Sequence, residues 1–147
     1  MPKLYIMVGV PGSGKSTYAE DILSKSATIF SSDKLRGELL GDENRQDNKD
    51  LIFSTLYDRA RTCILRGGSA VIDATNVTKS DRLRVLRHFA DIEGLEKIAV
   101  VVLATLDECI SRNAMRERKV PDKVIADFYN KLEKPVLEEG FDFIMEV

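Results

Sequence analysis

Residues 9 to 16 read Gly-Val-Pro-Gly-Ser-Gly-Lys-Ser and follow the apolar run at residues 4–8. The spacing is that of a glycine-rich loop, GxxxxGK[ST], in which successive backbone N–H groups turn inward around phosphate oxygens. Apolar residues at helical spacing continue over residues 16–23, so the loop joins a predicted strand to a predicted helix. A glycine turn with no phosphate to bind needs neither a strand before it nor a helix after it. The pattern therefore predicts a nucleoside triphosphate site.

Each side chain of this loop has a predicted role. Lys15 reaches the β- and γ-phosphates, and the Ser16 hydroxyl ligates Mg²⁺. The helix that begins near Gly14 adds the positive end of its dipole. The residues that we expect to hold the nucleotide are Gly9, Pro11, Gly12, Ser13, Gly14, Lys15, Ser16 and Thr17.

Length and composition indicate one globular domain over residues 1–147, with 44% hydrophobic residues. The longest apolar stretch, residues 98–104, is too short to span a bilayer, and a strand begins at the N-terminus with no signal sequence before it. We therefore expect a soluble, cytoplasmic protein that does not enter membranes. Cys63 and Cys109 lie in helical patterns rather than at a metal or redox spacing, which favours buried free thiols.

Short apolar runs without alternation are typical of strands buried on both faces of a parallel sheet. Helical patterns separate these runs, so the fold class is α/β, with a central parallel sheet of four to five strands and helices on both faces. The expected strands are residues 3–8, 27–30, 69–72, 98–104 and, weakly, 141–147. The expected helices are residues 15–25, 33–40, 47–66, 80–93, 107–118 and 122–134, with a connector at 41–48.

Ligands of an open parallel sheet collect at the carboxyl ends of its strands. The segments 9–17, 31–36, 73–76 and 105–107 follow successive strands and are expected to meet there. Asp33 fits either a general base for an acceptor hydroxyl or an N-cap shared with Ser31 or Ser32. Asp73 fits either a Mg²⁺ site beside Ser16 or an Asx turn, and Thr75 and Asn76 extend this polar cluster.

Two basic clusters are candidates for phosphate contacts. Arg112 and Arg116 are four residues apart, which places both on one side of a predicted helix. They either clamp phosphate oxygens, stabilising charge in the transition state, or form a solvated face relieved by Glu117. The second cluster either binds an acceptor's phosphates or is the polar face of an amphipathic helix; it comprises Lys79, Arg82, Arg84 and Arg87, joined by Arg36.

Taken together, these motifs resemble the kinase domain of phage-type polynucleotide 5′-kinases and, more distantly, zeta-toxin-like and other small P-loop kinases. The segments that carry the likeness are Ser32-Asp33-Lys34-Leu35-Arg36, Asp73-Ala74-Thr75-Asn76 and the stretch from Arg112 to Pro121, besides the glycine-rich loop. The resemblance implies a three-layer P-loop kinase fold with a helical lid at about residues 108–121. It also implies ATP as the phosphoryl donor and a DNA or RNA 5′-hydroxyl end as the acceptor.

Carried over by position, the resemblance gives catalytic roles to Asp33 as general base, Lys15 on the phosphates and Arg116 on the transferred phosphoryl group. Arg112 would be an ATP contact on the same lid, and Arg36 a contact to the acceptor's phosphate. Asp73, Thr75 and Asn76 complete the expected substrate side, with Ser16 and Asp73 at the metal. Two alternatives remain: a P-loop kinase for another hydroxyl, on a nucleoside, sugar nucleotide or modified DNA base, and a non-catalytic ATP switch.

Overall fold

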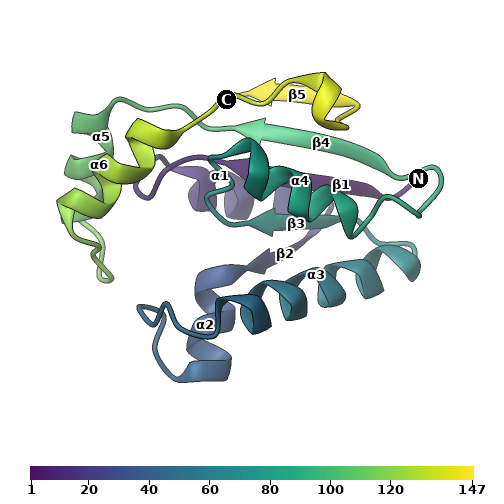
Figure 1. Ribbon diagram of the computed structural model, residues 1–147, viewed down its shortest axis with the longest axis horizontal. Coiled ribbons are helices and arrows are strands. Elements are labelled where there is room, and N and C mark those ends of the chain that lie inside the picture. Colours follow the sequence, from purple (N-terminus) through teal and green to yellow (C-terminus); the bar gives the residue numbers. More distant parts are fainter.

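The computed structural model describes residues 1–147 and contains one five-stranded parallel sheet in the order β2-β3-β1-β4-β5 (Figure 1). Every neighbouring pair of strands is parallel, as the apolar runs predict. The weakly predicted last strand is real and forms one edge of the sheet. The strands are β1 (Lys3–Val8), β2 (Thr28–Ser31), β3 (Ala70–Asp73), β4 (Glu96–Val101) and β5 (Phe143–Glu146).

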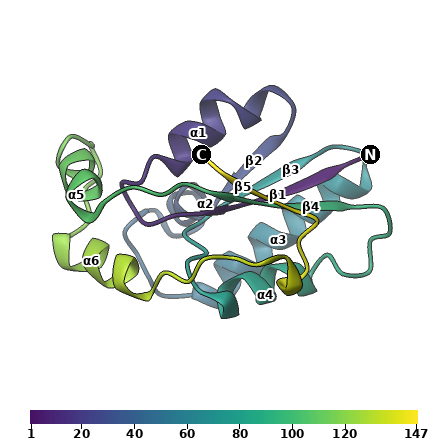
Figure 2. The ribbon, with the colours of Figure 1, turned by 90° about the horizontal axis from the view of Figure 1, so that it is seen from above.

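Helices cover both faces of this sheet. In Figure 2 helix α1 lies on one face, and α3 and α4 lie on the other. Helices α5 and α6 lie beyond the carboxyl ends of the strands (Figure 1). The helices are α1 (Lys15–Asp21), α2 (Ser32–Leu40), α3 (Lys49–Leu65), α4 (Lys79–Arg87), α5 (Leu106–Ala114) and α6 (Asp122–Lys131), with 3₁₀ turns at Leu23–Lys25 and Leu137–Glu139. None of these helices combines the length and the apolar composition that a membrane-spanning helix requires.

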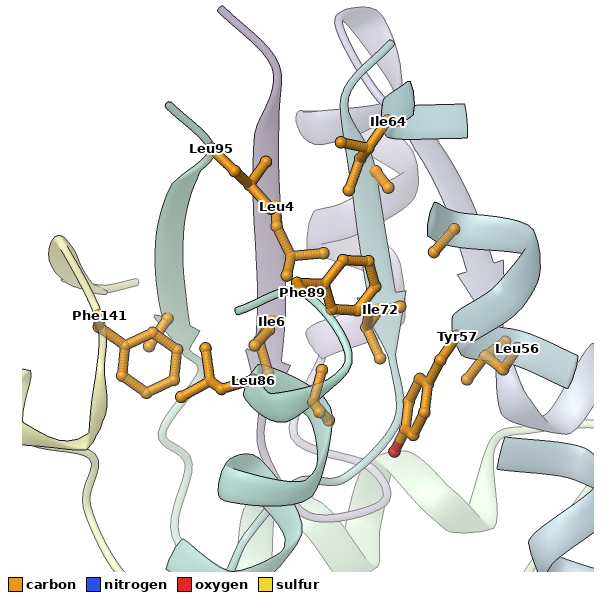
Figure 3. Close-up of a cluster of buried hydrophobic side chains, with 14 of the residues drawn as sticks. Leu4, Ile6, Leu56, Tyr57, Ile64, Ile72, Leu86, Phe89, Leu95 and Phe141 are labelled. Atoms are coloured by element: carbon orange, nitrogen blue, oxygen red, sulfur yellow. The ribbon is translucent and has the colours of Figure 1, made fainter. Parts of the chain in front are cut away.

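Strand β1 shows why the central strands are apolar on both faces. Leu4 and Ile6 belong to the core cluster under α3 and α4, whereas Tyr5 and Met7 belong to the cluster under α1. Figure 3 shows Leu4 and Ile6 beside Phe89, on the side of the sheet that α4 covers. Successive side chains of a strand point to opposite faces, so a strand packed on both faces needs an unbroken apolar run.

The helix predicted over residues 80–93 ends early. Helix α4 stops at Arg87, and the chain continues in turns to Gly94. The N–H groups of His88, Phe89 and Ile92 donate to carbonyls three residues back, rather than to the fourth residue of a continuing α-helix. Phe89 is buried and Ile92 packs against the same core, so their helical spacing reflects burial in turns.

The helix predicted over residues 107–118 also ends early, at Ala114. The Asn113 side chain donates to the Val120 carbonyl (2.7 Å) and accepts from the Val120 N–H (3.1 Å), so it closes residues 115–119 into a loop. Arg116 therefore lies outside α5, and the prediction that Arg112 and Arg116 share one side of a helix is wrong. The first turn of α5 is instead fixed by a capping box between Thr105 and Glu108.

The basic stripe predicted on α4 is not a continuous surface. Arg82 is fully buried and pairs with Glu139 through two bonds, of 2.7 and 3.1 Å. Its remaining nitrogen donates to the carbonyls of Asn76 and Val77, so Arg82 joins α4 to the C-terminal segment and to the turn after β3. The other members of the stripe, Lys79, Arg84 and Arg87, are exposed. Arg82 is therefore structural, and its complete burial keeps it from an acceptor's phosphate.

Candidate functional site

A cavity of about 810 Å³ opens at the carboxyl ends of the strands. Three of the four segments expected there supply lining residues, namely 9–17, 31–36 and 73–76. The fourth, 105–107, does not, because its capping box starts α5 and the chain runs outward from the sheet. The opposite wall comes instead from the α5–α6 arm, defined here as residues 106–131, which contributes Arg112, Met115, Arg116, Arg118, Lys119, Val120, Pro121, Val124 and Phe128.

The glycine-rich loop has the backbone conformation that its sequence requires. Gly12 and Gly14 have φ values of +83° and +98°, a region that glycine tolerates at no steric cost. A Cβ on Gly12 would also collide with the carbonyl oxygen of Cys109 on α5. Gly14 is the N-cap of α1, so Lys15 begins the helix at the cavity wall.

The nucleotide contacts predicted in this loop fall into two groups. Pro11, Gly12, Gly14, Lys15, Ser16 and Thr17 line the cavity. Gly9 and Ser13 do not: Gly9 donates its N–H to the Thr75 carbonyl (3.0 Å), and Ser13 is buried with a hydroxyl that has no hydrogen-bond partner. Gly9 therefore ties the loop to the strand end after β3.

Ser16 and Asp73 form the pair expected at a metal. The Ser16 hydroxyl donates to Oδ2 of Asp73 (2.8 Å), and Oδ1 of Asp73 is buried without a hydrogen-bond partner. A buried, unpartnered carboxylate oxygen beside a hydroxyl fits the oxygen ligands that Mg²⁺ prefers, because Mg²⁺ takes few protein ligands and completes its shell with water and phosphate. The Asx turn at Asp73 does not form, since the side chain bonds Ser16 instead.

Thr75 and Asn76 occupy different environments. Thr75 is half-buried and lines the cavity. Asn76 is buried with φ +46°, and its side-chain nitrogen donates to the carbonyls of Met7 (2.9 Å) and Ala74 (3.4 Å). Asn76 thus shapes the turn between β3 and α4, and its side chain is directed away from the expected substrate.

The structure distinguishes the two roles considered for Asp33, general base and N-cap. Ser31 is the N-cap of α2 and accepts from the Lys34 N–H (3.3 Å), so Asp33 is not the cap. Asp33 lies in the first turn of α2, lines the cavity, and accepts a hydrogen bond on Oδ1 from Arg36 (3.0 Å). Arg36 is buried against the ring of Phe53, with its guanidinium carbon 5.7 Å from the ring centroid.

The arginines of the arm lie at different depths. Arg112 is half-exposed and donates to the Ser13 carbonyl (2.8 Å), which ties α5 to the glycine-rich loop. Glu108 faces it at 3.6 Å, and the pKa of Glu108 is lowered chiefly by the hydrogen bond that the Thr105 backbone donates to it. Arg116 lines the cavity from the loop beyond α5 and forms no ion pair. Of the two guanidiniums, that of Arg112 contacts the glycine-rich loop, and that of Arg116 lines the cavity.

Several residues that line the cavity were not predicted from the sequence. Phe53 belongs to α3, and Asn44 and Gln46 belong to the connector after α2, which looks only polar in sequence. Arg118 lies in the same basic stretch as Arg116. It was not singled out because a helix was expected there, and helical spacing pairs Arg112 with Arg116. A cue existed in the apolar residues of the arm, since Val124 and Phe128 lie four apart on α6 and both line the cavity.

The cysteines form no second reactive site. Both are free; Cys109 is buried and Cys63 is half-buried. Burial raises the pKa of the Cys109 thiol, which disfavours the nucleophilic thiolate. No group of three or more His, Cys, Asp or Glu side chains is placed to hold a metal anywhere in the chain. The residues that carry the predicted chemistry therefore remain those that line the 810 Å³ cavity.

Comparisons with known proteins agree with this architecture. L-seryl-tRNA(Sec) kinase of Methanococcus maripaludis is 27% identical over 151 residues, covering 95% of this chain and 56% of that protein. The chain thus spans little more than half the length of this relative. Among solved structures, a chain of the Pnkp1/Rnl/Hen1 RNA repair complex superposes with a TM-score of 0.78 at 21% identity, over 89% of this chain and 44% of that one.

A gluconokinase from Sinorhizobium meliloti 1021 superposes with a TM-score of 0.66 at 19% identity, over 99% of this chain and 82% of that one. These structures share the P-loop kinase fold. The sequence itself matches the AAA domain family over residues 4–135, and this family implies ATP binding with Mg²⁺. Because that match spans most of the sequence, the chain belongs to the AAA domain family, and its kinase relatives support a phosphotransferase.

Proposed function

We propose that this protein transfers the γ-phosphoryl group of ATP to the 5′-hydroxyl of a DNA or RNA end. The observation that carries the proposal is the shared cavity: Asp33 and Lys15 both line it, and Arg116 lines it from the arm. Phosphoryl transfer needs mainly positioning and charge stabilisation, plus a group that accepts the acceptor's proton. These three side chains, brought from separate stretches of chain, supply those needs.

In the proposed reaction, Lys15 and the loop N–H groups hold the β- and γ-phosphates. Ser16 and Asp73 hold Mg²⁺, which when bound neutralises charge on these phosphates. The acceptor oxygen bonds to the γ-phosphorus, the bond from that phosphorus to the β-bridging oxygen breaks, and Asp33 takes the acceptor's proton. Arg116 stabilises the charge of the transition state, and the arm acts as a lid that excludes water.

The acceptor end of the cavity favours a nucleic acid over a simple polyol. Arg36 provides a buried cation beside Asp33, and Phe53 lies directly against it. Asn44 and Gln46 add two carboxamides to the same wall. A guanidinium suits a phosphate, an aromatic ring suits a stacked base, and carboxamides suit base edges. The likeness of the fold to a chain of an RNA repair complex supports the same acceptor class.

The test supplies γ-labelled ATP, Mg²⁺ and matched oligonucleotides of DNA and RNA that carry either a 5′-hydroxyl or a 5′-phosphate. We expect label only on the 5′-hydroxyl strands, at a position that a phosphatase releases. Lack of transfer to every oligonucleotide over a range of pH and salt would overturn the proposal.

A second candidate acceptor is a hydroxyl carried elsewhere than on a nucleic-acid end. The match to L-seryl-tRNA(Sec) kinase favours it, since that relative's name gives a seryl group on tRNA as the substrate. Seryl-tRNA, nucleosides, sugar nucleotides, gluconate and oligonucleotides with modified bases therefore belong in the same assay. Saturable transfer to one of them, with none to 5′-hydroxyl ends, would select this candidate.

A further inference from the structure

Arg118 bridges the α5–α6 arm to the opposite wall of the cavity. It lies in the loop between α5 and α6, with its side chain 20% exposed. One terminal nitrogen is 2.7 Å from Oδ2 of Asp33, and Nε is 3.3 Å from a carboxylate oxygen of Glu43. The other terminal nitrogen donates to Oδ1 of Asn44 at 3.4 Å. All three guanidinium nitrogens therefore have partners on α2 or on the connector that follows it.

This arrangement occupies both oxygens of the Asp33 carboxylate. Arg36 holds Oδ1 and Arg118 holds Oδ2. An ionised carboxylate offers about four lone pairs and the Asp33 side chain is 39% exposed, so the two guanidiniums do not fill it. A hydroxyl that approaches Oδ2 from the side of the arm nevertheless competes with Arg118 for that oxygen, and a general base must receive a hydrogen bond from the hydroxyl that it deprotonates. The side chain of Arg36 is only 8% exposed and packs on Phe53. Arg118 lies in an irregular loop, and its guanidinium keeps two other partners after it releases Asp33. Arg118 is therefore the residue that moves away from Asp33.

We propose that Arg118 masks Asp33 while no acceptor is bound, and that it thereby selects the acceptor hydroxyl over water. The inference rests on the proposed role of Asp33 as general base. Without the mask, a water oxygen would bond to the γ-phosphorus, the bond to the ADP bridging oxygen would break, and Asp33 would take the proton of the water. The products would be ADP and inorganic phosphate, with no acceptor modified.

An acceptor overcomes the mask because it brings binding energy that water lacks. Its contacts with the acceptor end of the cavity offset the loss of one ion pair, whereas a single water has no such contacts. Glu43 and Asn44 retain the displaced guanidinium, so the arm stays attached to the connector when Asp33 is released. Arg118 is thus a specificity-determining residue that acts through Asp33.

The experiment measures phosphate release from ATP and Mg²⁺ with no acceptor present, in the full chain. We expect Arg118→Gln to raise this rate by at least about tenfold, a conservative share of the roughly 10²–10⁴ that a positioned base contributes. The double variant Asp33→Asn/Arg118→Gln is expected to return to the wild-type rate. Lys123→Gln is the matched control, because Lys123 is exposed on α6, forms no ion pair and does not line the cavity.

Melting temperature and ATP affinity are measured for each variant, and both are expected to stay close to wild type. A folded Arg118→Gln protein with an unchanged hydrolysis rate overturns the proposal. A raised rate that persists in the double variant also overturns it, since Arg118 would then act on the arm and not on Asp33. Arg118→Lys provides a second reading should the glutamine variant fail to fold, with a smaller rise expected because an ammonium cannot span all three partners.

The readout separates this inference from the proposed function. No acceptor is used, so failure to phosphorylate any oligonucleotide leaves the hydrolysis test intact. Conversely, normal transfer to 5′-hydroxyl ends together with unchanged hydrolysis in Arg118→Gln would reject the mask alone.

Discussion

Asp33 takes its position from its neighbours in the fold and has no part in capping its helix. Ser31 satisfies the first turn of α2, so the Asp33 carboxylate lines the cavity, where Arg36 and Arg118 pair with its two oxygens. Arg36, one turn further along α2, fixes its orientation through a 3.0 Å bond. A carboxylate that a buried guanidinium orients toward a cavity suits proton transfer better than one engaged by backbone N–H groups.

The first expectation at this scale concerns Asp33 itself. Replacing it by Asn removes the proton acceptor and keeps the size of the side chain, so turnover should fall by about 10²–10⁴, the usual share of a general base. ATP affinity should change by less than about twofold, because the base acts on the acceptor. Steady-state transfer kinetics and direct ATP titration measure the two quantities. Equal losses in turnover and in ATP affinity would contradict the assignment.

A second expectation concerns the cations at the transferred phosphoryl group. Lys15→Ala and Arg116→Ala should each slow phosphoryl transfer by at least about a hundredfold, the scale seen when a preorganised charge partner is removed. Lys25→Ala is a suitable control, because Lys25 is exposed in the turn after α1 and does not line the cavity. Rates of labelled transfer at saturating ATP provide the measurement, and near-normal rates would refute the roles.

At the scale of elements, the arm depends on one buried amide. Asn113 is 3% exposed and bonds both the N–H and the carbonyl of Val120. These two bonds fix the loop that carries Arg116 and Arg118, although the loop has no helix or strand of its own. Positioning of the arginines therefore starts at a residue that touches neither the cavity nor a substrate.

Asn113→Ala tests this dependence. Loss of the amide leaves the half-buried Val120 N–H without its partner, at a cost below the roughly 1–3 kcal/mol of a fully buried group. We expect faster amide hydrogen exchange in residues 114–120 and slower phosphoryl transfer, with exchange in the sheet unchanged. Ser111→Ala serves as the control, since Ser111 is exposed on the same helix. Unaltered exchange in the loop would show that other contacts hold it.

The elements that local pattern decides were predictable, and those that tertiary contacts decide were not. The run around Ile6 predicts β1 because a strand packed on two faces must be apolar throughout. The end of α5 depends on Asn113 bonding Val120, seven residues away, which no periodicity encodes. Arg82 looked like a surface charge for the same reason: its partner Glu139 lies 57 residues away. The conformation of the glycine-rich loop was predictable because the positive φ values of Gly12 and Gly14 require glycine, whereas the sequence did not show that Gly9 and Ser13 lie outside the cavity lining.

At the scale of the whole molecule, helix α3 connects the cavity to the core. Phe53 lines the cavity, and one turn later Tyr57 lies in the core cluster, with ring centroids 5.9 Å apart. Figure 3 shows Tyr57 beside Leu56, with its ring directed inward from α3. The cavity wall and the core therefore share one rigid element, and the stability of the fold helps to hold the acceptor end in place.

Tyr57 also makes the free energy of unfolding decrease at alkaline pH. Burial raises the pKa of Tyr57 from 10.0 to about 12, against the opposing effect of Arg84. The unfolded chain loses this proton near pH 10 and the folded chain retains it to about pH 12. The contribution is therefore complete below pH 10 and is lost as the pH rises toward 12. Its full size is roughly 2 to 3 kcal/mol, since one pKa unit corresponds to about 1.4 kcal/mol.

Tyr57→Phe isolates this effect, because the other three tyrosines, Tyr5, Tyr18 and Tyr129, remain in both proteins. Urea unfolding at pH 8 and pH 11 gives the free energy of unfolding of each. Between pH 8 and pH 11 we expect the free energy of unfolding of the wild type to fall by about 1.4 kcal/mol more than that of the variant. This difference corresponds to one of the two units by which the pKa of Tyr57 is raised. Parallel losses in the two proteins would mean that the Tyr57 hydroxyl reaches water in the folded state, and α3 would then be less firmly seated on the sheet than its packing indicates.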